Sequence, residues 1–135
     1  MSLTTRFASR LAVFAFAGSS LLFAACGDDG DQNSAATVPE PTHDQVMAAE
    51  DALPADPRLA DIYERSCMAC HTIPESGAPL TLYTAAWQPR MDAKGMDALV
   101  TSAKVGLNAM PPMGQCPDCT DDDFADLITF MMVGD

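Results

Sequence analysis

Cys67-Met68-Ala69-Cys70-His71 is the stretch that decides the fold of this chain. Two cysteines separated by two residues and followed at once by a histidine form the C-x-x-C-H attachment pattern of a c-type haem. The spacing suits this chemistry because a short helical turn sets the two thiols at the separation of the two porphyrin vinyl groups. The histidine then lies under the iron as an axial ligand. A chance cluster, or half of a zinc site, is the competing interpretation.

A second segment offers a sixth ligand for such an iron. Residues 106–114 read Gly-Leu-Asn-Ala-Met-Pro-Pro-Met-Gly. A methionine thioether stabilises ferrous iron, and the two prolines directly after Met110 stiffen the backbone that carries its sulfur. We therefore expect His71 and Met110 to be the axial ligands, with Met113 as the alternative to Met110.

Cys116-Pro117-Asp118-Cys119 follows this loop, and three hypotheses compete for it. A four-cysteine zinc site would combine it with the distant first motif. A thioredoxin-like dithiol would need a strand before a helix, and the sequence predicts no strand. A structural disulfide is the simplest hypothesis because exported cysteines tend to oxidise, and closing so short a loop stabilises by about 2 kcal/mol.

Residues 1–25 are expected to be a signal peptide of the lipoprotein type. Arg6 and Arg10 precede an uncharged apolar run over residues 11–25, which is short for a membrane span and ends in small residues. The run leads into Leu-Phe-Ala-Ala-Cys-Gly at residues 22–27, which resembles a bacterial lipobox with Phe23 where leucine is usual. Cys26 would then be acylated. The alternative is ordinary cleavage and a soluble periplasmic protein.

Residues 26–43 contain little apolar surface and are expected to form a flexible acidic tether. Without Arg6 and Arg10, the seven Lys and Arg fall to five against nineteen Asp and Glu, a formal charge of −14. This charge argues against nucleic acid and anionic lipid headgroups, and it favours either redox partner proteins with a basic docking face or a solvated acidic surface that keeps the protein soluble. We expect the protein in the cell envelope, with a periplasmic domain tethered to a membrane through Cys26.

Residues 44–135 are expected to form one helical domain, since every strong apolar periodicity in them is helical. Helices are predicted over residues 44–53, 57–66, 96–105 and from Thr120 onward, with a short helical turn over 85–90. Asp56 and Thr120 are the expected N-caps, and Gly106 the expected stop. The predicted core faces are Leu59, Ile62 and Tyr63; Met96, Leu99, Val100 and Ala103; and Phe124, Leu127, Ile128 and Met131.

Trp87 and Arg90 are candidates for contacts with the haem propionates. An indole N–H beside a haem can bond a propionate, and a guanidinium can pair with the same carboxylates through two hydrogen bonds. The alternatives are plain core packing for Trp87 and a solvated surface position for Arg90.

The combination of motifs resembles the cytochrome c-five family, the small monohaem class I cytochromes c of bacteria. The resemblance spans residues 56–132. It implies an all-α class I cytochrome c fold, with three to five short helices around one covalently attached haem. It also implies ligation by His71 and Met110 and a disulfide between Cys116 and Cys119. The residues that carry it are Cys67-x-x-Cys70-His71, Ala86-Trp87-x-Pro89-Arg90, Lys94-Gly95-Met96-Asp97-x-Leu99, Ala109-Met110-Pro111-Pro112 and Cys116-x-x-Cys119-Thr120-Asp121.

These features predict a periplasmic-side electron carrier rather than an enzyme, with one-electron transfer through haem c. Two other functions stay open. One is a haem subunit of a membrane-associated dehydrogenase complex, and the other is a peroxidase-like enzyme with an open iron position. The second would need a distal base, and the only other histidine, His43, lies at the end of the expected tether.

Overall fold

The computed structural model describes residues 38–135, so the expected signal peptide and Cys26 lie outside the described residues. Within this part of the chain every regular element is helical, and no helix is both long and apolar enough to cross a membrane. The expected all-α fold is confirmed. The elements are α1 (His43–Asp51), α2 (Pro57–Ser66), α3 (Met68–His71), η1 (Pro74–Ser76), α4 (Thr84–Val105), η2 (Pro112–Gln115) and α5 (Asp121–Val133).

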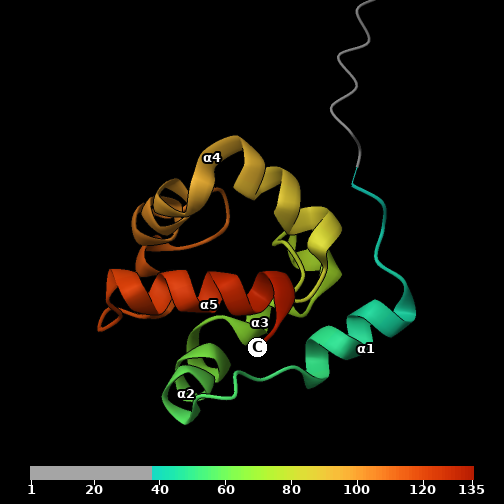
Figure 1. The fold of residues 1–135 in the computed structure, drawn as a ribbon, viewed down its shortest axis with the longest axis horizontal. Coiled ribbons are helices and arrows are strands. Elements are labelled where there is room, and N and C mark those ends of the chain that lie inside the picture. The colour runs from blue at the N-terminus through green and yellow to red at the C-terminus, as the bar shows by residue number, and fades with distance from the viewer. Residues whose placement is uncertain (1–37) are drawn as a thin grey trace, which may run out of the picture. The chain divides into compact units, whose positions relative to one another are not determined.

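Helix α5 is the central element of the fold. It packs against both α4 and α2, which lie on different sides of it in Figure 1. Its predicted core face is confirmed, because each of the four side chains is 5% exposed or less. The core faces of the other two helices pack on it through Ile62 and Tyr63 of α2 and through Leu99, Val100 and Ala103 of α4.

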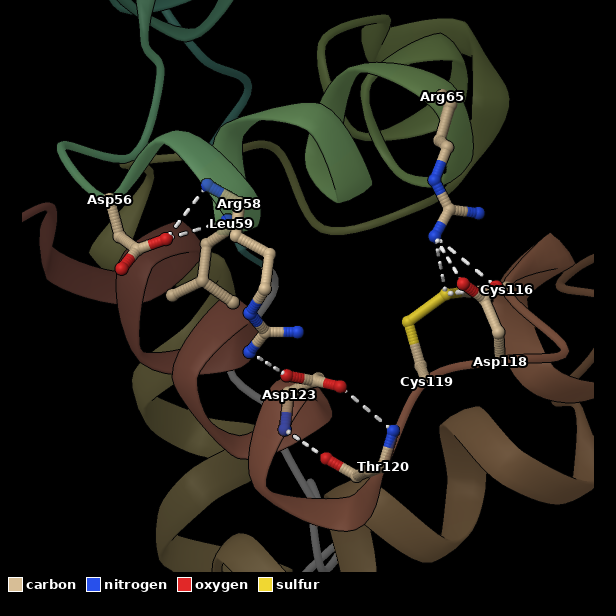
Figure 2. A network of polar contacts seen from close by, with 9 residues as sticks. All are labelled: Asp56, Arg58, Leu59, Arg65, Cys116, Asp118, Cys119, Thr120 and Asp123. Carbon is tan, nitrogen blue, oxygen red and sulfur yellow. Dashed lines mark hydrogen bonds and ion pairs between the residues drawn. A yellow bond between two sulfur atoms is a disulfide. The ribbon is translucent and has the colours of Figure 1, made fainter.

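The helix caps predicted from the sequence are present. The Asp56 carboxylate accepts hydrogen bonds from the backbone N–H groups of Arg58 and Leu59 at 2.8 and 3.0 Å. Thr120 and Asp123 form a reciprocal capping box at the start of α5. Asp123 also accepts a hydrogen bond from the Arg58 guanidinium, so the first turns of α2 and α5 are joined (Figure 2).

Helix α4 agrees with the prediction of two helical segments and differs in the length of the first. It spans residues 84–105 with a kink at Gly95, where the backbone is not helical and φ is 73°. Glycine has no Cβ and takes this conformation at little cost, so the first segment ends there and the helix predicted over residues 96–105 follows it. Pro89 lies inside α4, and the turn predicted over residues 85–90 is the first part of this longer helix.

The end of the expected tether lies against the helical domain. Helix α1 begins at His43 and is capped by Thr42, whose side chain and that of Gln45 form a capping box. The preceding residues also make contacts, since the Tyr83 hydroxyl donates a hydrogen bond to the Pro39 carbonyl at 2.7 Å. Residues 38–43, which the sequence assigned to the tether, therefore belong to the packed domain.

Candidate functional site

A single helical turn presents the Cys-x-x-Cys-His motif. The Cys67 N–H donates to the carbonyl of Tyr63 at the end of α2, and the His71 N–H donates to the Cys67 carbonyl at 3.0 Å. Neither Cys67 nor Cys70 is in a disulfide, and both line the same cavity. Burial raises the pKa of the Cys67 thiol to about 11, so this thiol is protonated at neutral pH.

This cavity has a volume of about 420 Å³, which is within the usual range for sites of small molecules and cofactors. Besides the two thiols it is lined by His71 of α3 and Met110 of the loop after α4. Much of the remaining wall is apolar and comes from α4 and α5, including Leu99, Leu127, Ile128 and Met131. The fold thus brings the two predicted ligands and both attachment thiols to one largely apolar cavity.

His71 is held in one orientation. Its side chain is buried, and its Nδ1 lies 2.8 Å from the carbonyl oxygen of Pro79. A carbonyl only accepts, so Nδ1 carries the proton and Nε2 keeps a lone pair. Burial lowers the pKa of His71 below its ordinary value, and the bond to Pro79 opposes this only in part. The imidazole is therefore neutral and has the tautomer that a metal ligand at Nε2 requires.

The backbone of Met110 is held through both its N–H and its carbonyl group. Its N–H and carbonyl exchange hydrogen bonds with Leu107 at 3.0 and 3.1 Å. A Cβ atom at Gly106 would lie 2.9 Å from the Met110 carbonyl, which explains the glycine at the end of α4. Met113 packs against the core cluster and is not part of the cavity wall. The geometry favours Met110 over Met113 as the ligand.

Trp87 and Arg90 line the cavity, but their donors have partners within the protein. The Trp87 indole N–H, a candidate for a propionate contact or for plain core packing, donates to the Leu80 carbonyl at 2.9 Å. The indole is stacked on the His71 ring, with centroids 5.7 Å apart and an interplanar angle of 18°. Arg90 donates through Nη1 to the Ala86 carbonyl. Trp87 thus acts as a buried support for His71, and one Arg90 donor is used on its own helix.

The second cysteine pair lies beside the cavity, and Cys116 is part of the cavity wall. In the structure a disulfide joins Cys116 and Cys119, whose Cα atoms are 5.4 Å apart, and Arg65 contacts both Cys116 Sγ and the Asp118 carboxylate (Figure 2). Residues 38–135 contain no group of three or more His, Cys, Asp or Glu placed to hold a metal ion. This part of the chain therefore contains no cluster of ligands that would support the zinc hypothesis.

Two residues of the site were missed by sequence reasoning. Pro79 acts through its backbone carbonyl, which every residue type carries, so composition could not single it out. Gly114 is buried against the Met110 methyl group, with its Cβ position 3.1 Å from Met110 Cε. A glycine four residues after Met110 was the available signal, and its positive φ of 53° explains the residue type.

The side chains that line the cavity fit a covalently attached haem. Two unbridged thiols, a buried neutral imidazole and a thioether are the donors that haem c requires, and the apolar wall suits its porphyrin.

Comparisons with known proteins agree with this fit. Residues 54–131 match the family described as "Cytochrome C oxidase, cbb3-type, subunit III". Cytochrome c5 of Ectopseudomonas mendocina is 44% identical over 72 residues, which are 53% of this chain and 83% of that protein. Cytochrome c5 of Azotobacter vinelandii is 47% identical over 64 residues, 47% of this chain and 77% of that protein.

A solved structure is also similar. The mono-haem ferrocytochrome c from Shewanella putrefaciens has 49% sequence identity and a TM-score of 0.50, and the match covers 57% of this chain and 94% of that one. The region matched by the family contains both attachment cysteines, His71 and Met110. The chain belongs to the cytochrome c5 family of class I cytochromes c and is an electron carrier with covalently attached haem c.

Proposed function

We propose that this protein carries single electrons on the periplasmic side of a bacterial cell envelope, with His71 and Met110 as axial ligands and Cys67 and Cys70 as the attachment residues. The observation that carries this proposal is that all four side chains line one cavity of about 420 Å³. The disulfide between Cys116 and Cys119 is part of the same proposal, since it closes the chain just after the Met110 loop.

Haem c supplies an iron that changes between the ferric and ferrous states. The chain holds that centre in place: Pro79 fixes the His71 tautomer, and the Leu107 backbone fixes Met110. Apolar side chains of α4 and α5 keep water from the cavity and lower its dielectric constant. With both axial positions occupied, transfer of an electron needs no acid, base or nucleophile from the protein.

The proposal of a carrier is favoured over peroxidase-like chemistry by the placement of the second histidine. His43 is exposed at the first turn of α1 and is absent from the cavity wall. A peroxidase-like site would need a base on the side of the iron opposite His71, and Met110 takes that place in the proposal. Whether the electrons serve a soluble partner or a membrane-associated dehydrogenase is a question about the partner, because the site chemistry is shared.

Location and partners complete the proposal. The signal peptide over residues 1–25 and the lipobox cysteine would tether the domain to a membrane, and the strongly acidic composition favours partners with a basic docking face. Labelling with radioactive palmitate in a bacterial host tests the anchor: the wild type should be labelled, and Cys26→Ser should retain its haem and lose the label. Label that persists in Cys26→Ser would contradict the anchor without affecting the haem site.

Two methionine variants test the ligation. Ferric haem with a methionine ligand has a weak absorption band at the red edge of the visible spectrum, which we expect in the wild type and in Met113→Ala. The band should be lost in Met110→Ala, which should also bind carbon monoxide readily, whereas the wild type should not. Rapid binding of carbon monoxide to the native protein would reject the carrier with two filled axial positions. A redox titration of the wild type should follow a one-electron curve.

A further inference from the structure

Residues 38–49 precede the part of the chain that matches the family, yet they are packed against it. We call them the strap. Ala49 is fully buried, and Val38 and Val46 pack against the same cluster of side chains. The Tyr83 hydroxyl donates to the Pro39 carbonyl at 2.7 Å, and Figure 1 shows this cyan segment beside the yellow-green start of α4. The cluster on the domain side consists of Leu80, Tyr83 and Ala86.

The segment that receives the strap is also the segment that orients His71. Pro79 accepts the hydrogen bond from His71 Nδ1, and Leu80 accepts the one from the Trp87 indole that is stacked on the imidazole. The Thr81 N–H donates to the His71 carbonyl at 2.8 Å. Residues 79–81 thus each form a hydrogen bond with His71 or with Trp87. The strap packs against Leu80 itself and against Tyr83.

Pro79 connects the two sides directly. A cleft of about 220 Å³ is lined by residues 38–41 of the strap and by Pro79, Leu80 and Tyr83. Pro79 also lines the haem cavity. A shift of the strap would therefore act directly on Pro79, the residue whose carbonyl accepts the hydrogen bond from His71.

The loop before Tyr83 is held mainly by contacts with other elements, since Thr81 is hydrogen-bonded to the Tyr63 hydroxyl at 2.9 Å and the Leu82 N–H donates to the Met131 carbonyl at 2.7 Å. Between α3 and α4 it contains only the short helix η1, and Gly77 has a φ of 75° with no atom within 4 Å of its Cβ position. Groups that orient a metal-ligating histidine tune its basicity, so their own support affects the metal. The strap supplies such support from outside the loop.

We propose that the strap is a positioning element for the axial histidine, acting through Tyr83 and the loop over residues 77–83, and that the reduction potential depends on its attachment. This inference rests on the proposed ligation by His71. It means that the segment leading from the expected lipid anchor ends on the support of the haem ligand. Tyr83 is the main positioning residue because its hydroxyl makes the strap's hydrogen bond to the domain.

Two variants and one matched control test the strap in the full-length haem protein. Tyr83→Phe removes only the hydroxyl, and Val38→Asp places a charge against the apolar cluster. Thr84→Val is the control, because it removes a hydroxyl bonded to Met132 from the adjacent residue and leaves the strap untouched. The readouts are the midpoint potential and the rate at which the His71 Nδ1 proton exchanges with solvent, measured by NMR.

We expect the Nδ1 proton to exchange about fivefold faster in Tyr83→Phe, the factor that corresponds to one net hydrogen bond, and faster still in Val38→Asp. The midpoint potential should change in both variants and stay unchanged in Thr84→Val. Wild-type exchange and potential in both strap variants would overturn the inference. Absence of the methionine-ligation band in the wild type would instead overturn the proposed function, so the two failures can be told apart.

Discussion

The backbone of Gly114 lies against the side chain of Met110, and a Cβ atom at residue 114 would be 3.1 Å from Met110 Cε. That distance is tighter than ordinary van der Waals contact, so a side chain at this position would press on the methionine. Gly114 is buried, has a φ of 53° and, like Met110, lines the cavity. The glycine therefore keeps space for the thioether to face the cavity.

We predict that Gly114→Ala weakens methionine ligation. The left-handed backbone costs an alanine about 1 kcal/mol, and the added methyl group displaces Met110 as well. The red-edge absorption band of the ferric protein should lose intensity, and carbon monoxide should bind faster than in the wild type. Both properties can be measured by visible spectroscopy.

Gly95→Ala is the matched control for that experiment. Gly95 has a φ of 73° and a ψ of 167°, a conformation found almost only in glycine, so alanine there carries at least as large a backbone cost, but no atom lies within 4 Å of its Cβ position. Gly95→Ala should reduce stability and leave the absorption band intact. An equal loss of the band in both variants would mean that backbone strain, and not contact with Met110, causes the effect.

The helices and their ends could be predicted from the sequence because their signals are local. Asp56 before Pro57, Thr120 before a run of aspartates and the apolar stripe of α5 each specify a structure within a few residues. The length of the first segment of α4 was underestimated, since Pro89 is typical of the end of a helical turn although it lies inside this helix. The family resemblance, carried by spacing motifs, is confirmed by its relatives.

The supports of the site could not be predicted, because they depend on tertiary contacts. The Pro79 carbonyl and the Leu80 carbonyl act through the backbone, which carries no residue-specific signal. The sequence therefore left the Trp87 indole between a propionate contact and plain core packing, and its hydrogen bond to a carbonyl seven residues earlier was not predicted. Residues 38–43 of the strap were predicted as part of the tether because their composition is polar, although Val38 packs against the domain.

We predict that Trp87→Phe destabilises the protein more than it changes the ligation. Phenylalanine keeps an aromatic ring near His71 but leaves the buried Leu80 carbonyl without its donor, which costs about 1–3 kcal/mol. Denaturant titration of the ferrous protein should show this loss. Gln88→Ala, which removes an exposed bond to Asp92 on the same helix, should cost about 0.5 kcal/mol or less. Equal costs in the two variants would contradict a structural role for the indole N–H.

We predict that removal of the second cysteine pair lowers stability and leaves the haem attached. Closing a loop this short contributes about 2 kcal/mol by loop-closure entropy, so Cys116→Ala combined with Cys119→Ala should lose about that much. Mass spectrometry under non-reducing conditions should first show two fewer protons in the wild type than in its reduced form. A double variant as stable as the wild type, or a wild type with free thiols, would contradict the proposed disulfide.

We predict that Asp123 stabilises the fold in a pH-dependent way. The Arg58 guanidinium and the Thr120 backbone N–H bond to its carboxylate and hold the pKa of Asp123 well below its ordinary value. A carboxyl whose pKa is depressed by folding contributes its full stability above its unfolded pKa, about 3.9, and loses it as the pH falls further toward the folded value. At pH 7, Asp123→Asn should therefore lower the free energy of unfolding by about 2 kcal/mol.

The pH dependence separates this effect from a simple loss of packing. The difference in unfolding free energy between the wild type and Asp123→Asn should shrink as the pH falls below about 4, because protonation removes the carboxylate from the wild type too. Asp122→Asn is the control, since Asp122 is exposed in the same first turn of α5 and makes no bond to Arg58. Its difference from the wild type should be small at every pH. A gap for Asp123→Asn that stays constant from pH 7 to pH 3 would show that the charge of Asp123 does not hold α2 to α5.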